Sequence, residues 1–169
     1  MDGSDLASVL LRATVGGTLL AHGWNHIWGG GRLAGTARWF ESIGLRPGRV
    51  HALLASVSEL AGGAMLVLGL LTPLAAATAV GTMAVALVAN HLRNGFFIFR
   101  PGEGYEYVLM IIVVAAAIGS LGGGRLSLDH ALGIADDLDG GLGLALTAGL
   151  GGAGAAAVLA TSWRPATCA

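Results

Sequence analysis

The sequence predicts an all-α integral membrane protein, an antiparallel four-helix bundle with a fifth, Gly- and Ala-rich helix towards the C-terminal end. Of its 169 residues, 54% are hydrophobic and 11% are charged, and the mean hydropathy is +0.74. These values are far from those of an ordinary soluble domain. The chain also contains several apolar runs close to the ~20 residues that cross a ~30 Å hydrocarbon core. A lipid bilayer is therefore the expected environment.

Four apolar segments form the first predicted domain, residues 1–130; they cover 6–28, 51–71, 73–92 and 105–121. The link Leu71-Thr72-Pro73 is so short that the second and third segments must form a tight hairpin. Residues 131–169 hold an acidic linker and a fifth segment, 140–160, whose small residues permit close helix contact but contribute little transfer free energy. The fifth segment either crosses the membrane or lies against the other four.

Charge and cysteine content exclude several classes of function. The nine basic residues are all arginine and are spread along the chain, which is unlike a nucleic-acid footprint. The single cysteine, Cys168, rules out a disulfide or a thiolate metal cluster within one chain. We find no nucleophile–base motif, phosphate loop or cofactor fingerprint. Catalysis by this chain alone is not expected.

The arginines predict an orientation in a cell membrane. In an up-and-down bundle, one face carries most of them, and the opposite face keeps Arg12 and Arg125. The positive-inside rule places the arginine-rich face, with loop 29–50, in the cytoplasm and the N-terminus outside. The residues on that face are Arg32, Arg38, Arg46, Arg49, Arg93 and Arg100, with Arg164 if the fifth segment spans.

Loop 29–50 contains a possible interfacial helix. In "LAGTARWFESIGL", the apolar residues Leu33, Ala37, Phe40 and Ile43 fall along one side. This spacing favours a helix in the plane of the membrane. A surface loop with a single helical turn remains the alternative.

Polar residues gather towards the arginine-rich face. His22 is roughly 9 Å inside the end of the first segment and Glu59 roughly 12 Å inside the second, at 1.5 Å per residue. Charged groups at such depths usually face the bundle interior and a partner. We therefore expect a polar pocket for ligand binding or proton relay, formed by His22, Asn25, Glu59, Asn90, His91, Glu103 and Tyr107.

Helical spacing suggests which faces point inward. Thr14, Thr18, His22 and His26 recur every four residues with Asn25 beside them, and Ser56, Glu59 and Gly63 share a face, as do Thr78, Thr82 and Asn90. Structural alternatives stay open: Glu59 could be a protonated acid in a hydrogen bond, and His26 and His91 could bond freed carbonyls. With no cysteine ligand and no second histidine pair, no metal site is predicted.

Arg12 lies deep in the first segment on the opposite side of the membrane. We expect a structural ion pair with Asp129, with a reach towards Glu59 as the alternative.

Several stretches resemble the DoxX family of small polytopic membrane proteins over about residues 8 to 130. They are "LLRATVGGTLLAHGWNHIWGG", "SELAGGAMLVLGLLTP", "ANHLRNGFF", "EGYEYVLM" and "GGGRLSLD". The resemblance implies a four-helix membrane bundle associated with redox enzymes. Family relatives include a membrane part of thiosulfate:quinone oxidoreductase and members of membrane assemblies that handle thiols and oxidative stress.

Two functions follow as hypotheses. In the first, the chain is a membrane subunit of a redox assembly whose pocket binds a quinone or relays its protons. In the second, it is a non-catalytic membrane scaffold or accessory subunit, in which the polar layer fixes helix register and loop 29–50 docks another protein. A transporter is less well supported, because no inverted repeat is visible.

Overall fold

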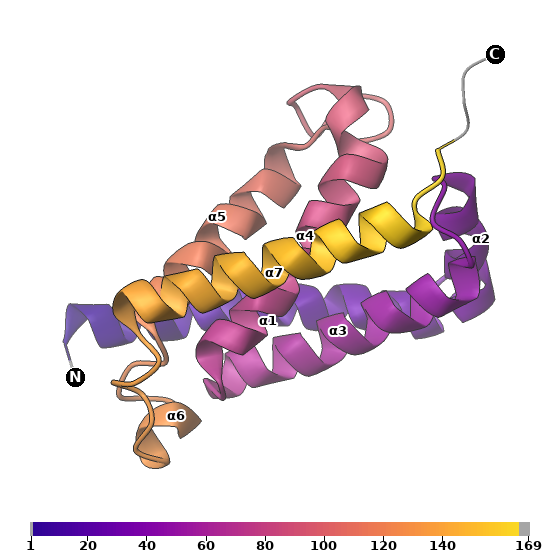
Figure 1. Cartoon of the computed structure of the whole chain (residues 1–169). Helices are drawn as coiled ribbons and strands as arrows, with labels where there is room; N and C mark the ends of the chain where they lie inside the picture. The colour runs from indigo at the N-terminus through magenta and orange to yellow at the C-terminus, as the bar shows by residue number, and fades with distance from the viewer. Residues whose placement is uncertain (1, 166–169) are drawn as a thin grey trace.

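The computed structural model describes residues 2–165, and over that range the chain forms an all-α bundle, as predicted (Figure 1). Cys168 lies outside the described residues. The long helices are α1 (Gly3–Trp28), α3 (Gly48–Leu68), α4 (Thr72–Ala86), α5 (Glu106–Leu121) and α7 (Gly140–Ser162). The shorter elements are α2 (Arg32–Ser42), the π-helical turn η1 (Leu87–His91), the 3₁₀ turn η2 (Leu92–Asn94) and α6 (Leu128–Ala131).

Among residues 2–165, four helical segments are long and apolar enough to cross a membrane, and the chain is a multi-pass membrane protein. They are Gly3–Trp28, Gly48–Leu68, Thr72–Asn94 and Gly140–Ser162, with hydropathies between 1.2 and 1.7. The fifth predicted segment is thus a helix of spanning length. Helix α5 is shorter, with 16 residues, or about 24 Å.

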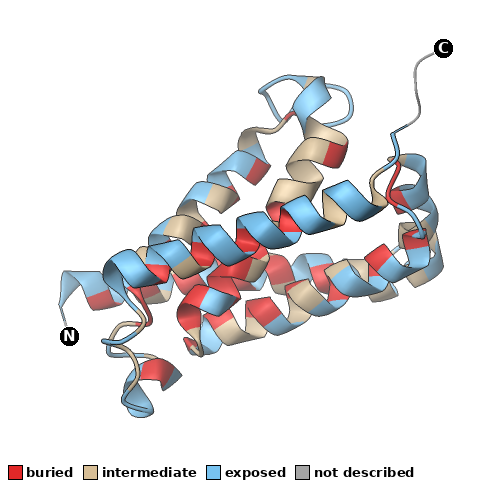
Figure 2. Cartoon of the chain, viewed as in Figure 1, coloured by how far each residue is buried: buried red, intermediate tan, exposed pale blue. Residues whose placement is uncertain are grey.

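The helices form two groups (Figure 1). α1 and α3 run side by side, with α2 across one end. α4 and α5 form a hairpin that diverges from them, and α7 packs against α4 and α5. The buried residues line the facing sides of the two groups (Figure 2). The central core is built from Val15, Leu19, Leu66, Val80, Ile111 and Ile118, among others.

Glycines bring α1 and α3 into close contact. A Cβ added to Gly63 would lie 2.7 Å from the carbonyl oxygen of Gly16, and one added to Gly23 would lie 2.8 Å from Leu60 Cγ. Such distances leave no room for a side chain, so the two backbones approach each other as small residues allow in membrane helix pairs. The predicted inward face of α3 is confirmed, because Ser56, Glu59 and Gly63 are all buried.

The predicted tight hairpin between α3 and α4 is also confirmed. Gly69 ends α3 with φ +65°, a left-handed conformation suited to glycine. A Cβ there would also collide with the guanidinium of Arg12 and with Ser127. The turn is therefore shaped by both backbone conformation and close packing.

Loop 29–50 contains the helix α2 rather than a single helical turn. Its 11 residues bury Phe40, and Leu33, Ala37 and Ile43 pack against the same cluster. Trp163, just after α7, donates from its indole nitrogen to the Ile43 carbonyl at 3.1 Å. The loop is thus a helix whose apolar side packs on the bundle, and it ties the end of α7 to the start of α3.

Arg12 and Asp129 meet in one buried cluster at the opposite end, where each binds backbone groups. Arg12 is 1% exposed and donates to the carbonyl oxygens of Leu66 and Leu126 at 3.1 and 2.8 Å. Asp129, 0% exposed, accepts from the backbone nitrogens of Leu71 and Thr72 at 2.6 and 2.9 Å. Within residues 2–165, no direct salt bridge joins the two, so the expected pairing is indirect.

The glycine contact between α1 and α3 gives a stability prediction. Gly63→Ala should lower the melting temperature in detergent, because the added methyl group would force the backbones apart, at about 1–3 kcal/mol. Gly17→Ala is the matched control, since no heavy atom lies within 4 Å of the added Cβ. Equal melting temperatures for both variants would contradict the close contact.

The Asp129 carboxylate gives a second stability prediction. Asp129→Ala should destabilise the fold by about 3 kcal/mol, because it leaves buried backbone donors at the start of α4 unpaired. Thermal unfolding measures the effect, and Asp137→Ala, at an exposed aspartate in the following loop, should have little effect. A similar loss in both variants would show that Asp129 does not secure this helix start.

Candidate functional site

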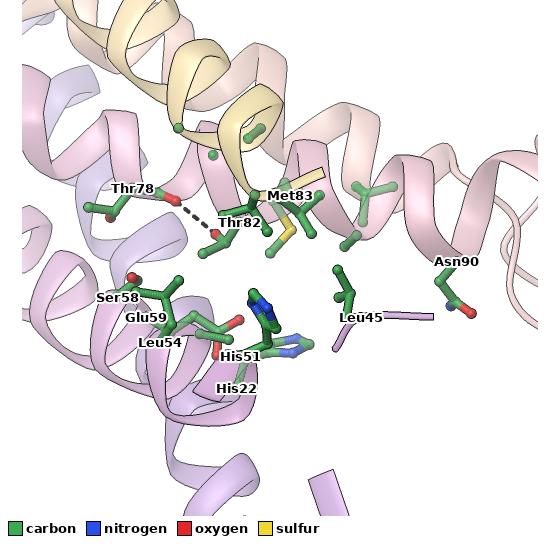
Figure 3. Close-up of a pocket in the computed structure, with 18 of the residues that line it drawn as sticks. His22, Leu45, His51, Leu54, Ser58, Glu59, Thr78, Thr82, Met83 and Asn90 are labelled. Carbon is green, nitrogen blue, oxygen red and sulfur yellow. Dashed lines mark hydrogen bonds between the residues drawn. The ribbon is translucent and has the colours of Figure 1, made fainter. Parts of the chain in front are cut away.

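A cavity of about 820 Å³ lies between the two groups of helices, within the size range of small-molecule pockets. Most of its lining is apolar, and α7 contributes Leu150, Gly151, Ala155 and Val158. Figure 3 shows Glu59, His51 and His22 together on one side and Thr78, Thr82 and Met83 across from them. The polar lining side chains from α1 and α3 are His22, His26, His51, Ser58 and Glu59, and those from α4, the following loop and α5 include Thr78, Thr82, Asn90, His91, Glu103 and Tyr107.

Glu59 is the most deeply placed acid in this lining. Its residue is 4% exposed, and Oε2 lies 3.1 Å from Nδ1 of His26. The two atoms are within ion-pair distance, but neither makes a hydrogen bond of acceptable geometry in the described part of the chain. We therefore treat the contact as an electrostatic one that leaves the carboxylate oxygen free to accept a hydrogen bond.

His51 is a site residue that the sequence analysis missed. It is 7% exposed in the first turn of α3, and its Nε2 has no hydrogen-bond partner among residues 2–165. In the sequence it only marks the start of an apolar segment. The signal was its spacing: it lies eight residues before Glu59, about 80° around the helix, which is within the width of one amphipathic stripe.

On the α4 side of the cavity, polar side chains bond to backbone carbonyl oxygens of α4 and of the loop that follows it. Thr78 and Thr82 donate to carbonyl oxygens of their own helix. Where α4 passes into a π-helical turn, His91 Nδ1 lies 2.9 Å from the Glu103 carbonyl oxygen. Asn94 donates to the Gly102 carbonyl at 2.6 Å and so helps hold the loop between α4 and α5. The polar atoms here are largely engaged.

His22 and Tyr107 form the rim of the cavity between α1 and α5. Both side chains are exposed, and their rings stack with centroids 6.5 Å apart and an interplanar angle of 26°. They therefore lie at an opening of the cavity rather than at its centre.

The predicted inward stripe of α1 was partly wrong. Thr14 and Asn25 are exposed, and Asn25 does not line the cavity, whereas His26 does. The buried face instead runs through Arg12, Val15, Leu19 and Gly23. Residues spaced by four turn about 40° per step away from one face because the helix has 3.6 residues per turn. Thr14 and His26 are accordingly about 120° apart.

The arrangement suits a neutral, mostly apolar molecule with one polar end. Six of the seven predicted pocket residues line the cavity: His22, Glu59, Asn90, His91, Glu103 and Tyr107. The described residues contain no group of three or more His, Cys, Asp or Glu side chains arranged to hold a metal ion. The acid and imidazole groups face an apolar space where hydrogen bonds to a ligand have little competition from water.

The contact between His26 and Glu59 can be tested by a double-mutant cycle. His26→Leu should destabilise the protein by about 2 kcal/mol, because it leaves a buried acid without its partner. Glu59→Gln added to that variant should recover part of the loss. His130→Leu, at an exposed position on α6, is the control. Strictly additive melting-temperature changes for the two substitutions would contradict an interaction between the residues.

Comparison with known proteins identifies the family. The DoxX family model matches residues 7–92, slightly more than half of the chain, from within α1 to the first residue of η2. Glu59, both α1 histidines, His51 and His91 fall within the match, while Glu103, Tyr107 and Asp129 lie beyond it. No curated protein and no solved structure matches the chain significantly. The chain, a multi-pass membrane protein with a cavity inside its bundle, belongs to the DoxX family.

Proposed function

We propose that this protein is a membrane subunit of a redox assembly and that its cavity holds a quinone-type molecule. The observation that carries the proposal is a cavity of about 820 Å³ with an apolar wall and one end where Glu59 and His51 are buried. A quinone has the same division into a polar ring and an apolar tail. Sites of this kind place a few polar groups to orient a largely apolar ligand.

The chain would act with a partner rather than alone. Its described side chains supply hydrogen-bonding and proton-exchanging groups, and a partner subunit would supply the electrons. Imidazole and carboxylate groups suit the exchange of protons with a quinone head group. The resemblance to family relatives found in quinone-linked and thiol-linked assemblies supports the same assignment, as an analogy.

The distribution of arginine supports an orientation with the α2 face in the cytoplasm and the N-terminus outside. Arg32, Arg38, Arg46 and Arg49 are all exposed around α2 and the start of α3. The end of α7 returns to the same face, because Arg46 donates from its backbone nitrogen to the Ser162 carbonyl at 3.0 Å. The positive-inside rule favours this arrangement.

Filling the cavity from α7 tests the proposed function. Gly154 lines the cavity, and Gly152 on the same helix does not; neither has a heavy atom within 4 Å of an added Cβ. Gly154→Phe should lower the quinone retained per protein after purification from native membranes, because the ring would occupy ligand space. Gly152→Phe should retain the wild-type amount.

Extraction and absorbance spectroscopy measure the retained quinone, and melting temperatures show that both variants fold. If the wild-type protein retains no quinone and takes up none on reconstitution, the proposed function is wrong. Equal retention in the two variants would place the quinone outside this cavity.

A further inference from the structure

We infer that His51 and Glu59 form the head-group subsite of the cavity and that this subsite selects a hydroxyl group, so that the reduced hydroquinone is its preferred occupant. This inference rests on the proposed function and extends it to residues and to an oxidation state of the ligand.

Two buried polar atoms that make no hydrogen bond carry the argument. Within the described part of the chain these are His51 Nε2 and Glu59 Oε2, whose residues are 7% and 4% exposed. Glu59 Oε2 lies 3.1 Å from His26 Nδ1, and a carboxylate oxygen beside such a contact can still accept a hydrogen bond. Buried polar groups nearly always have partners, because leaving them unpaired opposes folding. Both residues line the cavity. A ligand atom in that space is the partner that the fold leaves room for.

The spacing of the two residues suits a group placed between them. They lie about 80° apart around α3, and eight residues correspond to a rise of about 12 Å along the helix axis. Within residues 2–165, no hydrogen bond joins His51 Nε2 to Glu59 Oε2. Figure 3 shows both side chains on the same side of the pocket, close to His22.

A hydroxyl group fits both residues when one of them donates and the other accepts. It can donate a hydrogen bond to Glu59 Oε2 and at the same time accept one from an N–H at His51 Nε2. If His51 carries its proton on the other nitrogen and Glu59 is protonated, the hydroxyl exchanges the two roles. A quinone carbonyl or an ether oxygen can only accept. A site that both donates and accepts therefore favours a hydroxyl group over a quinone carbonyl or an ether oxygen.

The α4 and α7 sides of the cavity offer weaker competition for the head group. The Thr78 and Thr82 hydroxyls already donate to carbonyl oxygens of α4. His91 contacts the Glu103 carbonyl oxygen through Nδ1. The wall formed by Gly151, Ala155 and Val158 of α7 is apolar and suits the body of the ligand. The polar end of the ligand therefore belongs at α3 rather than at α4.

Binding of a hydroquinone and of its dimethyl ether to the full-length protein in detergent tests this selection. The two probes share their ring and a short tail, but only the hydroquinone can donate. Wild-type protein should bind the hydroquinone about tenfold more tightly, as the loss of one hydrogen bond predicts. His51→Phe should remove most of that preference, and His51→Gln, which keeps a donor and an acceptor, should preserve part of it.

Thr82→Val is the matched control, because it alters a cavity-lining hydroxyl that is already bonded to its own helix. It should leave the preference unchanged. Melting temperatures confirm that each variant is folded, and the comparison of the two probes on the wild-type protein does not depend on any variant.

The outcomes separate the two proposals. If no probe and no quinone binds to the wild-type protein, the proposed function itself fails. If both probes bind equally well, or if His51→Phe keeps the full preference, the cavity can still hold a quinone but the subsite at His51 and Glu59 is overturned. Displacement of the hydroquinone by an equal concentration of dodecanol would assign the subsite to lipid alcohols and overturn the quinone assignment.

Discussion

The close contact of α1 with α3 is the constraint on which the rest of the structure depends. Gly16 and Gly63 let the two backbones touch, and Gly23 seats α1 against Leu60 and Glu59. With this separation, His26 comes within 3.1 Å of the Glu59 carboxylate. A larger residue at either glycine would move α1 outward, because a methyl group has no space between the helices. The same contact thus fixes the bundle and the polar side of the cavity.

The cavity forms because α4 and α5 diverge from α1 and α3. α4 stays close to α3 near the hairpin, where a Cβ on Gly62 would collide with Thr78, and it diverges towards η1 (Figure 1). α7 packs along α4 and α5 and supplies one wall. Because α7 lies outside the matched family region, residues 7–92, the ligand-facing surface combines family helices with a helix that the match does not cover.

Local patterns in the sequence predicted a good part of the site. The depth of Glu59 within an apolar run and the clustering of His22, Asn90, His91, Glu103 and Tyr107 near one membrane face indicated an enclosed polar pocket. Asn25 was assigned to the pocket wrongly and Thr14 to the inward face of α1 wrongly, because a spacing of four drifts around the helix and the buried face of α1 runs instead through Val15, Leu19 and Gly23. His51 was overlooked because a histidine at the start of an apolar segment resembles an ordinary interfacial residue.

The sequence by itself determined the apolar helices, the short hairpin at Leu71-Thr72-Pro73, the membrane environment and the side of the bundle on which acid and imidazole groups gather. Each of these follows from composition and from residue spacing along one helix. The tertiary structure decided which way each helix is rotated, that Arg12 and Asp129 bind backbone groups rather than each other, and that buried atoms of His51 and Glu59 lack hydrogen bonds beside a wall formed by α7. Those features depend on contacts between residues distant in the chain, and the fit of whole helix surfaces sets them.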